Sequence, residues 1–504
     1  MPIARSVIGR NLSAAAPPAN IIYAASLSAS DVQTALNAAV AGGTVLLPAG
    51  TATWTTQVSW TAPANVTLKG AGSTSTRGGG DATVIVDGYA SGNSLLAIST
   101  SATGRFTMLG ITFEGGGAGA GNDKYNGIVN ISGQCKQISV HHCHIDTSTY
   151  SPALSSCGLQ FDGWTYGVVW ECILETAAGR INNAVRMFNK AYMNSDALGL
   201  GDQSWAAPTH LGTDEFVFIE DCDINYGFAN DASSGGSFVI RYNTMKGHAP
   251  AAHVQTHPTG GGARHRGGRS WEIYGNTFTA DDGQFISDCI WLSSGTGVVW
   301  GNTAPSSSAG GGTGYKNFIG GHDMRYDNST YTQTSTPNGW GYSGTHFNGT
   351  GSNWDGNTDS STGYPAIDQL GRGQGQLLVN DFPSTVNDST GTIAWPNQAL
   401  EPIYEWGNNW DPVPSNPHVL WAQSNPVSVQ NRDYYCGTDD NGNAITFTGA
   451  TGVGVGLLSA RPSSGLTAGV GYWATDTQTL YVATGATTWA TWYQPYTYPH
   501  PLRS

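Results

Sequence analysis

One short pattern recurs along the chain and constrains the fold more than any other feature. It reads apolar, any, apolar, two further residues, a small or amide residue, any, and then usually an apolar residue. It occurs seven times, as FTMLGITF (106–113), ISVHHCHI (138–145), GVVWECIL (167–174), VFIEDCDI (217–224), FVIRYNTM (238–245), WEIYGNTF (271–278) and GVVWGNTA (297–304). The steps between copies vary from 21 to 50 residues. A constant core at variable spacing predicts a solenoid with loop insertions.

The sixth residue of the pattern is predicted to lie where one strand turns into the next. The residues at this position are Ile111, Cys143, Cys172, Cys222, Asn243, Asn276 and Asn302. An Asn that points inward there can hydrogen-bond the backbone of neighbouring coils, so stacked copies predict a ladder. A two-layer β-sandwich is the alternative, but few NG or DG hairpin signals follow the repeats.

Composition excludes several classes of protein. The formal net charge of −14 argues against general binding to nucleic acid or to anionic membranes, which needs a basic surface. No run of 18 apolar residues could span a bilayer. The seven cysteines are an odd number with no CxxC spacing, and three of them occupy the repeat position. We therefore expect buried free thiols and not a disulfide framework.

The segment before the repeats predicts a helix followed by two short strands. Ser28 to Asp31 provide an N-cap, Val32, Leu36 and Val40 follow at helical spacing, and GG ends the run. GTVLLPAGTATW and NVTLKGAG come next. An amphipathic helix covering the open end of a solenoid protects strand edges that would otherwise be exposed.

With DVQTALNAAVAGGTVLLPAGT, VTLKGAG and repeats that end in NTM, NTF and NTA, the chain resembles the pectate-lyase-like right-handed parallel β-helix superfamily. That superfamily contains polysaccharide lyases, glycoside hydrolases, epimerases and phage tail-spike depolymerases. The resemblance implies an all-β, right-handed parallel β-helix and a polysaccharide substrate. It implies no catalytic residue, because no catalytic motif of a particular family is matched.

The resemblance covers roughly residues 28–305, which we take as the β-helix core. Residues 1–27 are then an N-terminal extension without a visible signal peptide, and the protein is expected outside the cell or released from it. Residues 306–424 are a loop-rich region that completes or flanks the solenoid. Residues 425–504 form a small β-rich appendage, with a hairpin in GVGYWATDTQTLYVATGATTWATW (469–492) and a Pro-rich strap, YQPYTYPHPL, across the body.

Counting 10 to 13 residues back from the turn position predicts which strands form a substrate groove. This places Asp162, Asn230, Asp231, Arg264, His265 and Arg266 near one another. Asp231 and Arg264 each lie 12 residues before an Asn of the ladder, so they are expected on adjoining coils, which are about 4.8 Å apart.

A basic stretch supports the same location. Residues 232–271 contain no Asp or Glu but five Lys and Arg residues and four His residues. We predict Asp231, Arg264, His265 and Arg266 as catalytic, and Lys246, His253, His257, Arg269, Asp162 and Asn230 as substrate-binding. Arg can bind a carboxylate in bidentate fashion, and His can transfer a proton. The alternative is a surface loop whose charges pair with acidic residues elsewhere.

Three functions remain open at this point. The first is a lyase that cleaves a uronate-containing polysaccharide by β-elimination; the second is a glycoside hydrolase with a pair of carboxylates; the third is a non-catalytic, tail-spike-like adhesin. A different face, with Trp170, Glu220, Arg241, Tyr274 and Trp300 pointing outward, is a further candidate surface that loops could cover. The sequence identifies no particular cofactor, although Ca²⁺ could bridge Asp162 and Asp231 to a uronate. A monomer is the default expectation, and a trimer is the alternative.

Overall fold

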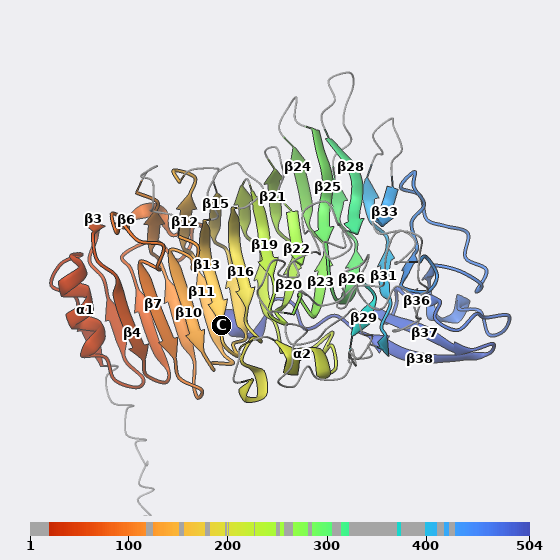
Figure 1. Ribbon diagram of the computed structural model, residues 1–504, viewed down its shortest axis with the longest axis horizontal. Coiled ribbons are helices and arrows are strands. Elements are labelled where there is room, and N and C mark those ends of the chain that lie inside the picture. The colour runs from red at the N-terminus through yellow and green to blue at the C-terminus, as the bar shows by residue number, and fades with distance from the viewer. Residues whose placement is uncertain are drawn as a thin grey trace, which may run out of the picture.

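The computed structural model describes residues 20–116, 124–150, 156–176, 182–196, 199, 201–225, 227–247, 253–256, 266–280, 285–304, 314–321, 370–373, 399–410, 418–422 and 429–504. Within these residues the protein is mostly β, and three long parallel sheets stack side by side to form a solenoid (Figure 1).

The chain visits the three sheets in turn, so that every third strand returns to the same sheet. Sheet 1 contains β1 (Ile21–Tyr23), β2 (Thr44–Leu46), β5 (Val66–Lys69), β8 (Phe106–Leu109), β11 (Ile138–His141), β14 (Gly167–Trp170), β17 (Val217–Glu220), β20 (Ser237–Arg241), β23 (Ser270–Tyr274), β26 (Thr296–Trp300), β31 (Ile403–Trp406) and β34 (Tyr434–Cys436). Sheet 2 contains β3 (Gly50–Trp54), β6 (Thr83–Asp87), β9 (Thr112–Glu114), β12 (His144–Thr147), β15 (Ile173–Thr176), β18 (Asp223–Asn225), β21 (Thr244–Gly247), β24 (Thr277–Ala280), β27 (Thr303–Ala304) and β32 (Asn409–Trp410). Sheet 3 contains β4 (Val58–Ala62), β7 (Leu96–Thr100), β10 (Val129–Gly133), β13 (Cys157–Asp162), β16 (Asn183–Phe188), β19 (Phe228–Ala232), β22 (His253–Thr256), β25 (Phe285–Leu292), β28 (Gly314–Gly321) and β33 (His418–Ala422).

The core lies between the three sheets, where side chains of stacked strands meet in register. In sheet 3, Ile131, Phe161 and Met187 occupy one such column and are fully buried. Their neighbours along each strand point outward because successive side chains of a strand alternate between faces. Burial of apolar area contributes about 25 cal/mol per Å² to stability, so each coil is held by the coils on either side.

The predicted asparagine ladder is confirmed at the turn from sheet 1 to sheet 2. The Asn276 side-chain amide donates to the Asn302 side-chain oxygen at 2.9 Å, and Asn243 donates to Asn276 at 3.0 Å in the same way. Asn302 in turn donates to Asn408 at 2.9 Å. Asn408 belongs to a later coil, and the parallel sheets continue as far as β34. The region from 306 to 424 therefore contributes strands to the solenoid.

The cysteines of the repeat fill the same turn position in earlier coils. Cys143, Cys172 and Cys222 are completely buried, and all seven cysteines of the chain are free thiols. The expectation of buried free thiols is confirmed.

The described residues contain two α-helices, and both lie outside the sheets. α1 (Ala29–Asn37) begins at the N-cap Ser28, whose hydroxyl accepts a hydrogen bond from the Asp31 amide at 3.2 Å. It buries Val32 and Leu36 and lies at the end of the solenoid in Figure 1. α2 (Asp202–Ala206) lies in an insertion between β16 and β17. The described chain also contains short 3₁₀ helices at η1 (Gly79–Asp81), η2 (Met193–Ser195), η6 (Leu458–Ala460) and η7 (Pro501–Arg503), and a two-stranded pair of β29 (Arg372–Gly373) and β30 (Ala399–Leu400).

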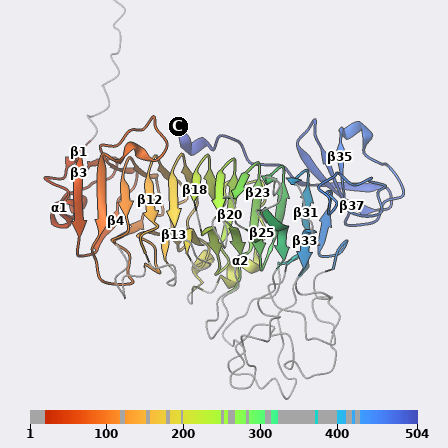
Figure 2. The same cartoon turned by 90° about the horizontal axis from the view of Figure 1, so that it is seen from above.

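The C-terminal appendage is a four-stranded sheet at the other end of the solenoid (Figure 2). It consists of β35 (Val453–Gly456), β36 (Gly471–Ala474), β37 (Thr479–Gly485) and β38 (Thr488–Tyr493). β36, β37 and β38 pair antiparallel, as the alternation in 469–492 predicts. The last residues then run back along sheet 1, where Arg241 donates to the carbonyls of Tyr496 and Thr497 at 2.8 and 2.9 Å. The last residues therefore lie as a strap along the outer face of sheet 1.

Candidate functional site

The outer face of sheet 3 carries a column of polar side chains at matched positions of four coils. Asn130 pairs with Gln160, Gln160 with Arg186, and Arg186 with Asp231. The apolar residues between them, such as Leu159 and Val185, point into the core. Strand alternation therefore explains why this polar column faces outward.

Two of these outward side chains are nevertheless buried. Gln160 is 3% exposed and Arg186 is 2% exposed. The guanidinium of Arg186 lies 4.3 Å from the centre of the Tyr125 ring and donates to the Tyr125 carbonyl. Within the described residues, the side-chain oxygen of Gln160 and one carboxylate oxygen of Asp231 are buried without a hydrogen-bond partner. Buried polar atoms normally have a partner, so this column has hydrogen-bonding capacity that the described chain does not use.

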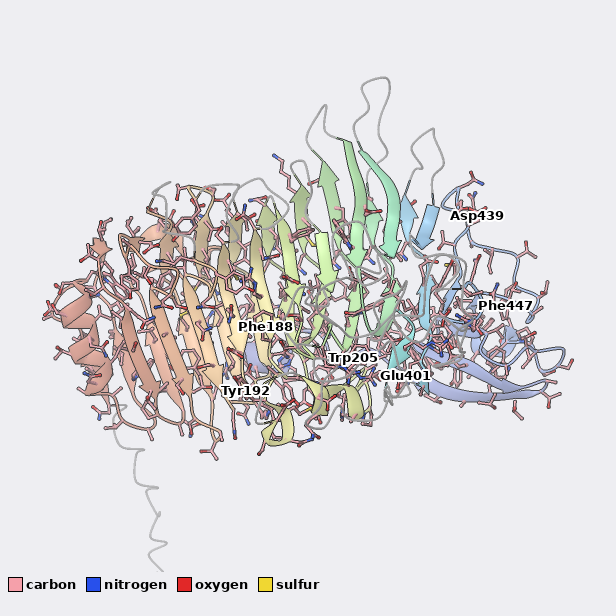
Figure 3. The ribbon with its side chains drawn as sticks, viewed as in Figure 1. Phe188, Tyr192, Trp205, Glu401, Asp439 and Phe447 are labelled. Atoms are coloured by element: carbon pink, nitrogen blue, oxygen red, sulfur yellow. The ribbon has the colours of Figure 1, made fainter. Side chains whose placement is uncertain are left out.

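The polar column continues into a cavity at the carboxyl ends of these strands. Its volume is about 480 Å³, and it is lined by Ser132, Gly133, Gln134, Asp162, Gly163, Tyr192, Ser195 and Asp196. The cavity brings together two carboxylates, several hydroxyl groups and one aromatic ring. Tyr192 is 48% exposed and follows β16, close to Phe188 (Figure 3).

Glycines let the coils of the cavity floor stack closely. Gly133 and Gly163 both have positive φ, at 103° and 84°. A Cβ on Gly163 would lie 2.4 Å from the Gly133 carbonyl oxygen, and one on Gly133 would lie 2.4 Å from the Thr100 carbonyl oxygen. Only glycine avoids both the backbone strain and these clashes.

The carboxylates of the cavity are held by backbone amides. Asp162, the last residue of β13, accepts a hydrogen bond from the Gly163 amide at 2.6 Å. Asp196 lies in the insertion after β16 and accepts from the Asp202 amide, the first residue of α2, at 3.0 Å. The insertion therefore supplies one carboxylate and the tyrosine, while the solenoid supplies the other carboxylate.

Two residues that we predicted to contact substrate instead fasten this insertion. Arg266 is fully buried and pairs with Asp202 at 2.6 Å. Arg269 is 1% exposed, pairs with Glu401 at 2.6 Å and donates to the Ala207 carbonyl at 2.8 Å. Both guanidinium groups lie near the ring of the fully buried Trp205, at 4.9 and 5.5 Å. Trp205 and Glu401 are labelled in Figure 3. Both arginines therefore fit the alternative interpretation of the basic stretch, in which its charges pair with acidic residues elsewhere in the chain.

The remaining predicted residues are only partly brought together. Asp162 and Asp231 both lie on the outer face of sheet 3, whereas Asn230 points inward and is fully buried. Lys246 lies on sheet 2, where it pairs with Asn225. His253 lies in β22, of which only the backbone is described, and His257, Arg264 and His265 lie outside the described residues.

Counting back from the ladder gives the wrong residues for the coil that contains Asn276. The strand of sheet 3 in that coil is β22, and Gln255, not Arg264, pairs with Asp231. The chain between β22 and β23 is longer than in neighbouring coils, so a fixed offset from Asn276 falls inside this connection. Arg186 and Asp196 were missed for the same reason, because a long insertion follows β16. The alternating NAVRMF (183–188) could have identified that strand.

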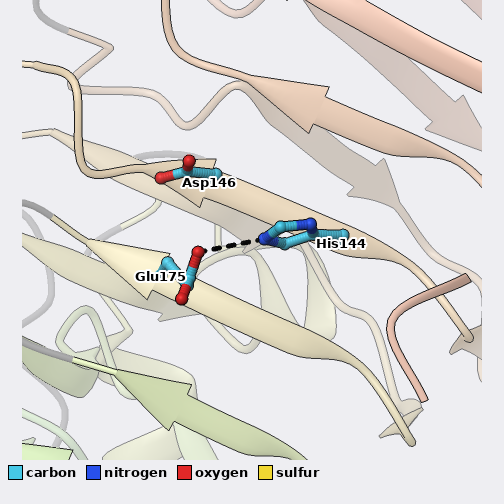
Figure 4. Close-up of side chains that lie close together, drawn as sticks. All are labelled: His144, Asp146 and Glu175. Carbon is cyan, nitrogen blue, oxygen red and sulfur yellow. Dashed lines mark hydrogen bonds and ion pairs between the residues drawn. The ribbon is translucent and has the colours of Figure 1, made fainter. Parts of the chain in front are cut away.

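A second cluster of charged side chains lies on the outer face of sheet 2 (Figure 4). Potential ligand atoms of His144, Asp146 and Glu175 lie within 4.8 Å of one another. His144 bridges Glu175 at 3.1 Å and Asp81 at 3.2 Å. The hydrogen bond to Glu175, with that to Asp81, raises the pKa of His144 to about 9. These ion pairs account for the cluster without a metal.

Compared with known families and with curated proteins, the sequence matches no family model and no curated protein. In the part of the chain that the structure describes, we find no helix of sufficient length and hydrophobicity to cross a bilayer.

Proposed function

We propose that the protein binds and cleaves a polysaccharide along the outer face of sheet 3, with Asp162 and Asp196 as the reacting carboxyl groups. The observation that carries this proposal is the 480 Å³ cavity in which both carboxylates, Tyr192 and two serines meet. A long parallel sheet offers an extended surface for a polymer, and a tyrosine ring provides a face on which a sugar can stack.

The chemistry that this pair supports best is hydrolysis of a glycosidic bond. One carboxyl group protonates the leaving oxygen, and the other activates water or attacks the sugar. The two aspartates have different surroundings, because one ends a strand of the solenoid and the other belongs to the insertion. Two carboxyl groups from separate parts of the chain can therefore flank a glycosidic bond.

Elimination from a uronate polysaccharide is the second candidate, and Arg186 is the observation that favours it. Its guanidinium lies on the same outer face, in register with Asp231. A lyase must neutralise the carboxylate next to the proton that is removed. We rank elimination second because Arg241, Arg266 and Arg269, the described arginines of the basic stretch, are each paired with a carboxylate. A calcium ion that bridges Asp162 and Asp231 to a uronate stays a prediction.

Finer features of the fold belong to the same proposal. Parallel crossovers are almost always right-handed, so we propose that the solenoid is a right-handed β-helix whose first coil is capped by α1. We also propose that the protein acts outside the cell in which it is made, where polysaccharide substrates are found, and that it acts as a monomer or as a trimer.

The test is cleavage of pectate, alginate, hyaluronan, chitosan and xylan, assayed for new reducing ends and for the ultraviolet absorbance of an unsaturated sugar. Hydrolysis gives the first signal alone, and elimination gives both. Asp162→Asn and Asp196→Asn should each reduce turnover by about two orders of magnitude, the scale of general acid–base catalysis. The exposed Asp440→Asn in the C-terminal appendage is the matched control. Unchanged turnover in both pocket variants would refute the proposal, as would a lack of cleavage of any polymer.

A further inference from the structure

Two lysines beside the cavity, Lys190 buried and Lys136 half-buried, have no carboxylate within ion-pair distance among the described residues, although the charge of Glu215 acts on both amines. Lys190 is 1% exposed, and its amine lies over the rings of Tyr166 and Phe216, at 5.4 and 5.2 Å. The amine of Lys136 lies 3.6 Å from the Trp164 ring and donates to the Trp164 carbonyl at 2.7 Å. Among the described residues, neither amine forms an ion pair.

Another buried lysine shows the usual arrangement. Lys124 is fully buried, but Asp87 lies 3.3 Å from its amine, and the Tyr89 carbonyl accepts from it at 2.6 Å. The carboxylate whose charge acts on Lys190 is that of Glu215. Glu215 instead accepts a hydrogen bond from the Tyr166 hydroxyl at 3.2 Å and lies 3.5 Å from His210. Burial disfavours an ammonium group that has no ion-pair partner, so an anion bound between the two amines would stabilise their charged form.

The lysine pair adjoins the proposed substrate cavity through two turns of the solenoid. Gln134 lines the cavity, and Lys136 follows it by two residues in the same turn. Gly163 also lines the cavity, and Trp164 is the next residue. A sugar in the cavity would therefore have its neighbour in the polymer close to Trp164 and the two amines.

We propose that Lys136 and Lys190 bind an oxyanion, the carboxylate or sulfate group of an acidic sugar next to the one held in the cavity. The substrate part of this inference rests on the function proposed above, whereas the anion site does not. An oxyanion would accept hydrogen bonds from the free N–H groups of the amines. Trp164 and Tyr166 would shield the pair from water.

The site should bind its anion in a pH-dependent way. Burial, and then the charge of Lys190, lower the pKa of Lys136 to about 7. Burial also lowers the pKa of Lys190 to about 7. The titratable and charged groups that face the two amines are Glu215, Arg269, His210, Cys135 and Tyr166. An anion favours the protonated amines, so its affinity should increase as the pH falls through 7.

The first test uses inorganic sulfate, with binding measured by calorimetry at constant ionic strength. We expect sulfate to bind at pH 6 and to bind about a hundredfold more weakly at pH 8, because each of the two amines that loses its proton weakens binding about tenfold. Lys136→Met should weaken binding at pH 6 at least about tenfold. Lys136→Arg keeps one of the two charges at all pH values, so sulfate binding to this variant should weaken only about tenfold between pH 6 and pH 8. Lys69→Met, at the end of β5, is the matched control and should bind like the unmodified protein.

The second test identifies the source of the anion. Oligogalacturonate should displace sulfate, and its methyl-esterified form, which has the same backbone without charge, should not. If sulfate binds but no acidic oligosaccharide displaces it, the ligand is a free anion and the substrate part is wrong. If sulfate binding at pH 6 is absent or is unaffected in Lys136→Met, the anion site is wrong. Asp162→Asn separates the two proposals, because it should abolish cleavage while sulfate affinity stays unchanged.

Discussion

The outer faces of sheet 1 and sheet 3 both carry polar and aromatic side chains in register, but their surroundings differ. On sheet 1, Glu220 and Arg241 form a fully buried ion pair at 2.7 Å beneath the C-terminal strap. Glu220 also accepts from the His500 amide at 3.0 Å and pairs with Arg503 at 3.2 Å. On sheet 3, the corresponding column ends in the cavity that contains Asp162. The strap thus pairs the charged side chains of sheet 1, whereas on sheet 3 one carboxylate oxygen of Asp231 is buried without a hydrogen-bond partner.

This difference shows that a side chain on the outer face of a sheet does not by itself identify a binding surface. Trp300 and Tyr274 stack with their rings 4.4 Å apart, and Trp300 is also stacked with Trp406 at 5.7 Å. Such a row of aromatic residues resembles a platform for sugars when only the sequence is considered. The strap and the appendage instead make it a second apolar core, in which Trp300 contacts Trp473 at 5.2 Å.

Breaking the ion pair of sheet 1 should have the largest effect on stability. Arg241→Met removes the fully buried partner of Glu220 and the donor to two strap carbonyls, and leaves the buried carboxylate with Arg503 as its one cationic partner among the described residues. We expect a loss of about 3–5 kcal/mol in the free energy of unfolding, measured with urea. Polysaccharide cleavage by the folded protein should stay unchanged, because this face is covered.

The double variant Glu220→Gln/Arg241→Met is the control, because it removes both charges. It should be less destabilised than the sum of the two single variants. If Arg241→Met abolished cleavage without loss of stability, sheet 1 and not sheet 3 would be the active face.

The solenoid could be predicted because its signals are local. The apolar alternation of each strand and the Asn at each turn lie within eight residues, and Asn243, Asn276 and Asn302 form the expected ladder. Even here the extent was underestimated, since Asn408 extends the ladder beyond an interruption of 106 residues. A repeat separated by such a long connection gives no periodic signal.

The site was harder to predict because it depends on coil lengths and on distant partners. Asp162 was identified by counting, but the connection before β23 moved Arg264 out of register. Arg266 and Arg269 form ion pairs with residues 64 and 132 positions away in the sequence. A cation-rich segment and its distant acidic partners cannot be matched from composition alone.

Tyr192 offers a smaller test of the open face. Tyr192→Ala removes a half-exposed ring from the wall of the cavity and leaves the solenoid intact. We expect KM to rise about tenfold, equivalent to about 1.4 kcal/mol, with turnover and melting temperature nearly unchanged. Tyr23→Ala, in the exposed edge strand β1, is the control. A large fall in melting temperature without a change in KM would make Tyr192 a structural residue.

The smallest effect on the free energy of unfolding is expected from a substitution on the outer face of sheet 2. It tests whether an uncovered cluster of ion pairs stabilises the protein less than the covered pair of sheet 1. The side chain of His144 is 19% exposed, and those of Glu175 and Asp81 are 29% and 61% exposed. Hydrogen bonds to these carboxylates raise the pKa of His144 to about 9, above the value of about 6.5 of an unfolded chain. The stabilisation is therefore fully present below pH 6.5 and is lost as the pH rises through 9.

His144→Gln should reduce the free energy of unfolding by at most about 1 kcal/mol at pH 6, because solvent screens exposed pairs. At pH 10 it should have almost no effect. Urea unfolding at both pH values measures the difference, with Arg77→Gln, which breaks an exposed pair with Asp223, as the control without a titrating His. An equal loss at pH 6 and pH 10 would mean that His144 contributes by packing and not by charge.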